Sequence, residues 1–92
     1  MVMDIETFTQ LVLAEGFSAP LEVIRDANFF IEVHTHPFEA KALILKGQIE
    51  IGLGESSSCF LPGDIFHLHT QEPHWERYGP EGVVYLSARK NA

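Results

Sequence analysis

From Pro20 onward the chain is a series of short apolar segments separated by turn-forming residues. Within residues 48–53, for example, apolar side chains alternate with polar residues or glycine, which is typical of a strand buried on one face. About eight short strands at such regular spacing predict an all-β sandwich or barrel of antiparallel strands. The expected strands are residues 21–25, 29–36, 42–45, 48–53, 58–61, 65–69, 74–78 and 83–88.

Several segments between these strands contain the residues that turns require. Gly47 offers a turn between the third and fourth strands, and residues 54–57 offer a hairpin loop after the fourth. The Pro-Gly-Asp sequence at residues 62–64 has the composition and order of a β-turn, in which Asp64 is expected to accept backbone hydrogen bonds. The glycines and proline of residues 79–82 predict the last sharp turn.

The segment before Pro20 has helical rather than strand periodicity. Its apolar residues predict a short helix from about Asp4 to Glu15, with Asp4 as the N-terminal cap and Gly16 in the left-handed conformation that often ends a helix. Neither a linker nor a low-complexity run divides the chain. Residues 1–92 are therefore expected to form a single domain, with the helix at about 4–15 and the barrel at about 20–90.

Composition limits the partners and the compartment of this chain. Thirteen acidic residues against six basic ones give a formal charge of −7, which disfavours nucleic acid as a partner. The apolar runs are too short to span a membrane, and the first residues lack the basic region and long apolar stretch of a secretory signal. The single cysteine, Cys59, is expected to be a small buried side chain and cannot form an internal disulfide. We therefore expect a cytoplasmic protein.

A homodimer is expected from the size of the domain. A chain of 92 residues buries only a modest core, and small barrels leave sheet edges that need to be covered. The N-terminal helix and the strand after Pro20 are the elements most available for packing against a second copy.

The five histidines fall into two groups, and the first group predicts a metal site. His34 and His36 are separated by one residue, so on a strand both side chains point to the same face. Pro37 then ends the strand or places it at an edge. Imidazole suits several transition metals, so these ligands do not identify the ion. In the second group, His67 and His69 are expected to be exposed strand residues or hydrogen-bonded partners in the core.

Two motifs extend this pattern along the chain. The first is His34-x-His36 followed by Gly47, and the second is the Pro-Gly-Asp turn at residues 62–64 followed by Pro-His at residues 73–74. Together they resemble the two motifs of the cupins, which are small β-barrels of jelly-roll type. The segment that begins at residue 74 is similar to that of small bacterial single-domain cupins.

The resemblance implies a single antiparallel jelly-roll barrel with a short N-terminal helix, and it makes His74 the third metal ligand. Counting back from Gly47, the carboxylate or amide ligand of the family falls on Ala40, and Glu39 lies one residue earlier. On a regular strand Glu39 would face away from the pocket and leave a three-histidine shell, like that of thiol-dioxygenase cupins. A bulge at Pro37 would instead turn Glu39 inward. The expected pocket side chains are Phe38, Ala40, Ala42 and Ile44.

One function is favoured and two alternatives remain. The favoured one is a cytosolic cupin that holds a divalent iron, manganese, zinc or nickel ion through its histidines and acts on a small organic molecule. If it is an enzyme, the resemblance implies dioxygenase-like or isomerase-like chemistry. The first alternative is a non-catalytic small-ligand-binding or sensor domain whose metal site is weakened or absent. The second is a metal-free enzyme, with His67, His69 or Glu50 as protonatable groups.

Overall fold

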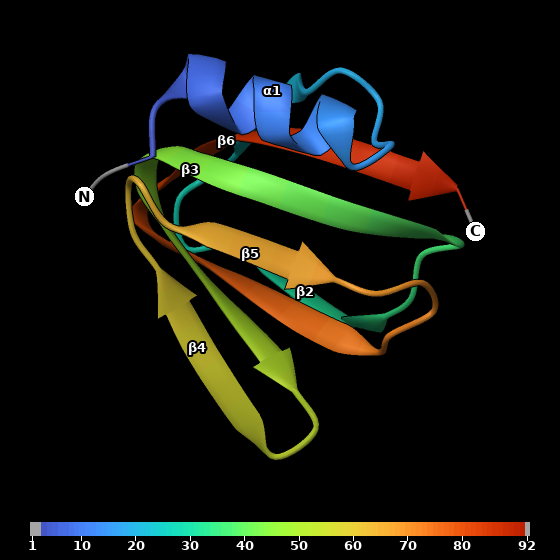
Figure 1. Cartoon of the computed structure of the whole chain (residues 1–92). Coiled ribbons are helices and arrows are strands. Elements are labelled where there is room, and N and C mark those ends of the chain that lie inside the picture. The colour runs from blue at the N-terminus through green and yellow to red at the C-terminus, as the bar shows by residue number, and fades with distance from the viewer. Residues whose placement is uncertain (1–2, 92) are drawn as a thin grey trace.

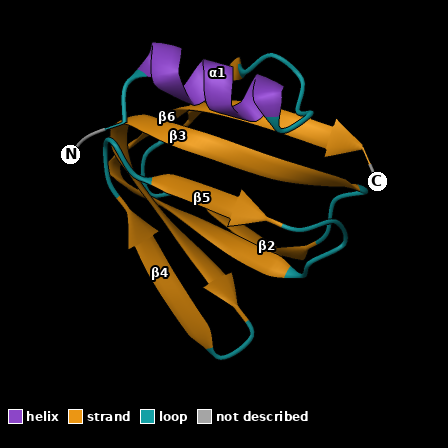
Figure 2. Ribbon diagram, viewed as in Figure 1, coloured by secondary structure: helices purple, strands orange, loops and turns teal. Residues whose placement is uncertain are grey.

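Two long bent strands, β3 (Phe38–Leu53) and β6 (His74–Asn91), extend through the whole fold of the computed structural model, which describes residues 3–91 (Figure 1). They pair with each other in antiparallel fashion from Phe38 opposite Asn91 to Gly52 opposite Trp75. A helix and four shorter strands complete the chain (Figure 2). These are α1 (Ile5–Ala14), β1 (Leu21–Arg25), β2 (Phe30–His34), β4 (Ser56–Phe60) and β5 (Ile65–Leu68).

The bends in β3 and β6 divide the sheet into two layers. In one layer the first half of β3 lies between β5 and the second half of β6, and β1 adds to the far side of β6. In the other layer the second half of β3 lies between β4 and the first half of β6, and β2 adds to the far side of β6. All of these pairings are antiparallel, which confirms the predicted all-β jelly-roll barrel with one short helix.

Alternation along β3 separates two apolar clusters. Ala42 and Ile44 point into the barrel, where they pack with side chains from both layers. Leu43 points to the opposite face and packs beneath α1, against Phe8 and other residues of the helix and of β6. Figure 1 shows α1 lying across the outer face of the β3–β6 layer. The inner face of this layer is therefore left to line the inside of the barrel.

The helix agrees with its sequence prediction. The Asp4 carboxylate accepts a hydrogen bond from the Thr7 backbone N–H at 2.7 Å, and Gly16 has a φ of +92° just after the helix ends. No helix among residues 3–91 is long and apolar enough to cross a membrane.

Two predicted turns are wrong, because β3 and β6 continue through them. At Gly47 the chain bends and does not reverse, and residues 79–82 form an irregularity opposite Gln48 within the β3–β6 ladder. Gly47 has a φ of +72° and Gly82 a φ of +75°. The same glycines that suggested turns therefore supply positive φ angles at bulges, where both long strands change layer together.

The hairpin turn after β3 and the Pro-Gly-Asp turn agree with their sequence predictions, whereas the predicted burial of Cys59 does not. Gly54 and Glu55 form a two-residue turn between β3 and β4. The Pro-Gly-Asp turn is present, and the Asp64 carboxylate accepts a hydrogen bond from the Leu61 backbone N–H at 2.8 Å. The prediction of a buried Cys59 is wrong. This residue is exposed, because it lies on the short edge strand β4 opposite Glu50.

The bend at Gly47 should be the most sensitive glycine position. A Cβ atom there would lie 2.1 Å from the backbone oxygen of Gly82, whereas a Cβ at Gly54 meets no atom within 4 Å. Both residues have positive φ, so Gly54→Ala should cost about 1–2 kcal/mol of unfolding free energy from backbone strain alone. Gly47→Ala should cost roughly 1–3 kcal/mol more because of the clash. Urea unfolding of both variants tests this, and equal losses would contradict it.

Candidate metal centre

Four side chains from two strands and one loop meet at one end of the barrel. They are His34 at the end of β2, His36 in the segment after it, and His74 and Glu76 at the start of β6. One nitrogen or carboxylate oxygen of each lies within 4.8 Å of those of the others. His74 and Glu76 are buried, with 1% and 8% of their surface exposed. This arrangement gathers a metal-type donor set in a largely desolvated place.

The pairing of β2 with β6 brings the first two histidines to this position. His34 is opposite His74 and Ile31 is opposite Glu76, so β2 carries one more residue than β6 between these two pairs. That bulge changes the direction of the strand as it approaches the site. The expectation that one strand holds both His34 and His36 is wrong, because β2 ends at His34. Their rings nevertheless lie 4.9 Å apart between centroids.

Backbone carbonyls hold two of the imidazole rings. Nδ1 of His34 lies 2.7 Å from the carbonyl oxygen of Glu32, and Nδ1 of His74 lies 2.9 Å from that of Glu72. Since a carbonyl can only accept, each Nδ1 carries a proton and donates it. In the neutral ring the other nitrogen, Nε2, is then an unprotonated acceptor directed at the site, which is the form that binds a metal.

Glu76 lies between these two acceptors. Its Oε2 atom is 3.1 Å from Nε2 of His34 and 3.2 Å from Nε2 of His74. Its Oε1 atom accepts a hydrogen bond from the Tyr78 hydroxyl at 3.0 Å. A carboxylate and two Nε2 lone pairs repel one another unless a positive charge, either a proton or a metal ion, lies among them. The donor set therefore fits a cation.

The local electrostatics favour the neutral form of His36. Burial lowers the pKa of His36, and the nearby His34 and His74 lower it further, whereas Glu76 acts in the opposite direction. Burial and the neighbouring Glu76 carboxylate raise the pKa of Tyr78, so its hydroxyl stays protonated and continues to donate to Glu76. At neutral pH the site thus has a neutral His36 and a fixed donor behind its carboxylate.

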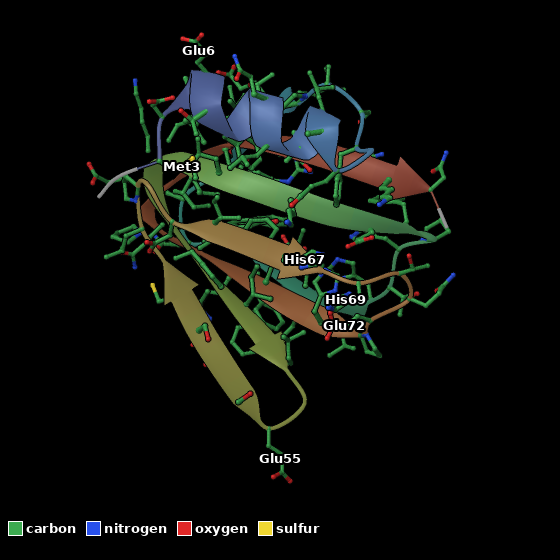
Figure 3. All side chains as sticks on the ribbon, in the orientation of Figure 1. Met3, Glu6, Glu55, His67, His69 and Glu72 are labelled. Atoms are coloured by element: carbon green, nitrogen blue, oxygen red, sulfur yellow. The ribbon has the colours of Figure 1, made fainter. Side chains whose placement is uncertain are left out.

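Glu39 does not join this group. It lies on the outer face of the barrel with His67 and His69, and Nε2 of His67 is within hydrogen-bonding distance of its carboxylate. The first half of β3 alternates regularly, so Ala40 faces inward and Glu39 faces outward, as expected for a strand without a bulge at Pro37. The hydrogen bond from His67 lowers the pKa of Glu39. Figure 3 shows His67 and His69 near one end of β5.

A cavity of about 100 Å³ opens inside the barrel beside the candidate metal centre. His36, Glu76, Phe38 and Ala40 are among the residues that line it. Ala42 and Ile44, which the sequence also predicts to line the pocket, are not among the residues that line this cavity. They face the inside of the barrel, where they belong to the packed core together with Phe66 and Tyr85.

Sequence reasoning missed Glu76. The three-histidine shell expected for a regular β3 is incomplete, because a carboxylate reaches the site from β6 instead. The signal was present: His74 and Glu76 are two residues apart on an expected strand, so their side chains share a face. The cupin resemblance places the carboxylate or amide ligand before Gly47, so it does not point to a carboxylate after His74.

Known structures with the same architecture are numerous, although no family model and no curated protein matches this sequence. The cupin domain of Cnp3 from Schizosaccharomyces pombe superposes with a TM-score of 0.71 at 18% identity, covering 84% of this chain and 54% of that one. An RmlC-like cupin from Shewanella frigidimarina gives a TM-score of 0.68 at 16% identity, covering 80% of this chain and 66% of that one. This chain is a small cupin-fold domain.

The structures similar to this cupin-fold domain include one that is named as an enzyme. The DMSP lyase DddQ from Ruegeria pomeroyi superposes with a TM-score of 0.71 at 26% identity, covering 79% of this chain and 38% of that one. KdgF from Halomonas gives a TM-score of 0.65 at 18% identity over 80% of this chain. This cupin-fold domain spans only 54%, 66% and 38% of the lengths of the first three structures.

The pKa of His36 tests the arrangement of the charges. In the metal-free protein His36 should titrate below its ordinary value of 6.5. Glu76→Gln should lower that pKa further, because it removes the negative charge that favours imidazolium. Glu39→Gln is the matched control and should leave His36 unchanged, since Glu39 faces His67 on the outer surface. Ring resonances followed by NMR against pH report the result. A rise in the His36 pKa in Glu76→Gln would contradict the geometry.

Proposed function

We propose that this cupin domain binds one divalent transition-metal ion through His34, His36, His74 and Glu76 and uses it to bind or transform a small organic molecule. The observation that carries the proposal is the convergence of two carbonyl-oriented Nε2 atoms on the buried Glu76 carboxylate. Such an arrangement calls for a cation at its centre. Three imidazoles and one carboxylate suit iron, manganese, zinc or nickel.

The chemistry would take place at coordination positions that the protein leaves open. Four protein ligands leave one or two positions free on an ion that accepts five or six, and the barrel cavity adjoins His36 and Glu76. When bound, the ion would supply Lewis-acid or oxygen-activating chemistry. The chain's own residues orient the imidazoles, through the carbonyls of Glu32 and Glu72, and hold the carboxylate, through Tyr78.

Relatives in fold support a small-molecule role. The neighbours include a protein named as a DMSP lyase, and we propose by analogy that a small organic molecule is the ligand here. The alternative of a non-catalytic sensor with a weakened metal site rested on Ala40 in place of a carboxylate. Glu76 supplies a carboxylate from another strand, which favours the metal-binding proposal. The enzymatic step, whether dioxygenase-like or isomerase-like, stays open.

A cytoplasmic homodimer is the proposed setting. The exposed Cys59 thiol suits a reducing compartment. The edge strand β1 exposes Leu21 and Ile24, and Phe29 and Val33 are also exposed, so apolar side chains are available for packing against a second copy. Sedimentation equilibrium at micromolar concentration tests the dimer, and a clean monomer would refute it.

Two histidine variants test the metal site against its nearest competitor. His36→Ala should weaken binding of Zn²⁺ or Mn²⁺ by about 100-fold or more, because it removes a direct ligand. His69→Ala removes one histidine from the outer Glu39 cluster and should change the affinity little. Titration of the metal-free protein with each ion gives the affinity and stoichiometry, and thermal melting of both variants checks that the barrel is folded. The opposite ranking of the variants would place the ion at the outer cluster.

A further inference from the structure

The lining of the barrel cavity includes positively charged side chains that the metal proposal does not use. Besides His36 and Glu76, its lining includes Arg25 at the end of β1 and Arg89 near the end of β6. The rest of the lining is mainly apolar, with hydroxyl groups from tyrosines and Ser87. The cavity thus combines two side chains of the candidate metal centre, His36 and Glu76, with two guanidinium groups.

Neither arginine is neutralised by a carboxylate among residues 3–91. The ion pairs of the described part of the chain engage other cations, such as Lys41 with Glu15 and Arg77 with Glu50. Arg25 donates to the backbone carbonyl of Ile24, at 3.3 Å, and its side chain partly offsets the burial that raises the pKa of the Tyr78 hydroxyl. Glu76 lines the same cavity but forms no ion pair with either arginine among residues 3–91, and both arginines are exposed, so their guanidinium groups are available to an anion from outside.

Phe38 holds Arg89 beside the candidate metal centre. The guanidinium carbon of Arg89 lies 4.3 Å from the centroid of the Phe38 ring, within the range of a cation–π interaction. The Phe38 ring also stacks on the ring of His36, with ring centroids 4.9 Å apart and an angle of 18° between the planes. The Phe38 ring therefore contacts both Arg89 and His36, one of the proposed metal ligands.

We propose that this cavity binds a compact organic acid, with its carboxylate on Arg89 and its remaining polar group directed at the metal ion. This inference rests on the proposed metal site. A planar guanidinium can hold a carboxylate through two parallel hydrogen bonds, which a lysine cannot do. Arg25 adds positive charge on the same cavity, so the site prefers anions to neutral molecules.

The remaining lining fits such a ligand. Burial raises the pKa of Tyr85 to about 12, so its hydroxyl stays protonated and can donate a hydrogen bond to a carboxylate. The cavity volume of about 100 Å³ is smaller than the roughly 150 Å³ engineered cavity that accommodates benzene, which restricts the enclosed part of the ligand to a few heavy atoms. A short-chain acid meets both conditions.

Anion binding should depend on the metal. Glu76 also lines the cavity, and its negative charge repels a carboxylate as long as nothing neutralises it. A divalent ion at the histidines reverses the local charge and opens the site to an anion. The metal-free protein should therefore bind a small acid much more weakly than the metal-loaded protein does.

The experiment uses the full chain loaded with Co²⁺, whose visible spectrum reports changes in its coordination, and malonate as the probe. Malonamide, which has a similar size and no charge, is the matched ligand control. Arg89→Gln should weaken malonate binding by about tenfold to hundredfold, as expected for loss of a charge-assisted hydrogen-bond pair, with Co²⁺ stoichiometry unchanged. Arg77→Gln is the matched protein control, because Arg77 pairs with Glu50 outside the cavity and should bind malonate like wild type. Arg89→Lys, which keeps the charge but loses the planar fork, should give an intermediate affinity.

The outcomes separate this inference from the proposed metal site. If Co²⁺ binds and malonate affinity is the same in wild type and Arg89→Gln, or if malonamide binds as well as malonate, the anion inference is wrong and the metal site stands. If wild type binds no Co²⁺, both are overturned. Retained Co²⁺ with selective loss of malonate in Arg89→Gln supports both.

Discussion

The pairing of β3 with β6 along nearly their whole lengths is the constraint on which this structure depends. Each strand belongs to both layers of the barrel, so the two must bend at the same level to stay paired. The bends contain Gly47 and Gly82, where a side chain on Gly47 would collide with the Gly82 backbone. Because β6 passes through both layers, one end of it carries His74 and Glu76 and the other carries Arg89. The two sides of the cavity are thus parts of one strand.

The charges around His34, His36, His74 and Glu76 explain why this cluster is a candidate metal-binding site. A buried carboxylate is costly unless a proton, a cation or several donors compensate it, and Tyr78 supplies one donor. In His34 and His74, Nδ1 donates to a backbone carbonyl. In the neutral rings each Nε2 is therefore a hydrogen-bond acceptor, and it lies beside the Glu76 carboxylate, which is also an acceptor. The outer cluster differs in this respect. There, Glu39 is compensated by a direct hydrogen bond from His67 on an exposed face, so no further cation is required.

The sequence predicted the features that depend on local chemistry. The N-terminal cap at Asp4, the Pro-Gly-Asp turn and the alternation of β3 all follow from neighbouring residues, and the alternation correctly separates Ala40 from Glu39. Gly47 was misread because a glycine with positive φ has the same sequence signature in a turn and in a bulge. The two-residue spacing places Glu76 on the same strand face as His74, but its meeting with His34 depends on the register of β2 against β6, which no local pattern specifies.

The central claim is that one metal ion sits among His34, His36, His74 and Glu76. Anomalous diffraction from crystals of the protein loaded with one equivalent of Zn²⁺ tests it most directly, because the scattering peak locates the ion without reference to activity. We expect a single dominant peak within coordination distance, about 2.0–2.2 Å, of an imidazole nitrogen from each of the three histidines and of an oxygen of Glu76. A dominant peak beside Glu39, His67 and His69, or no peak inside the barrel, would contradict it.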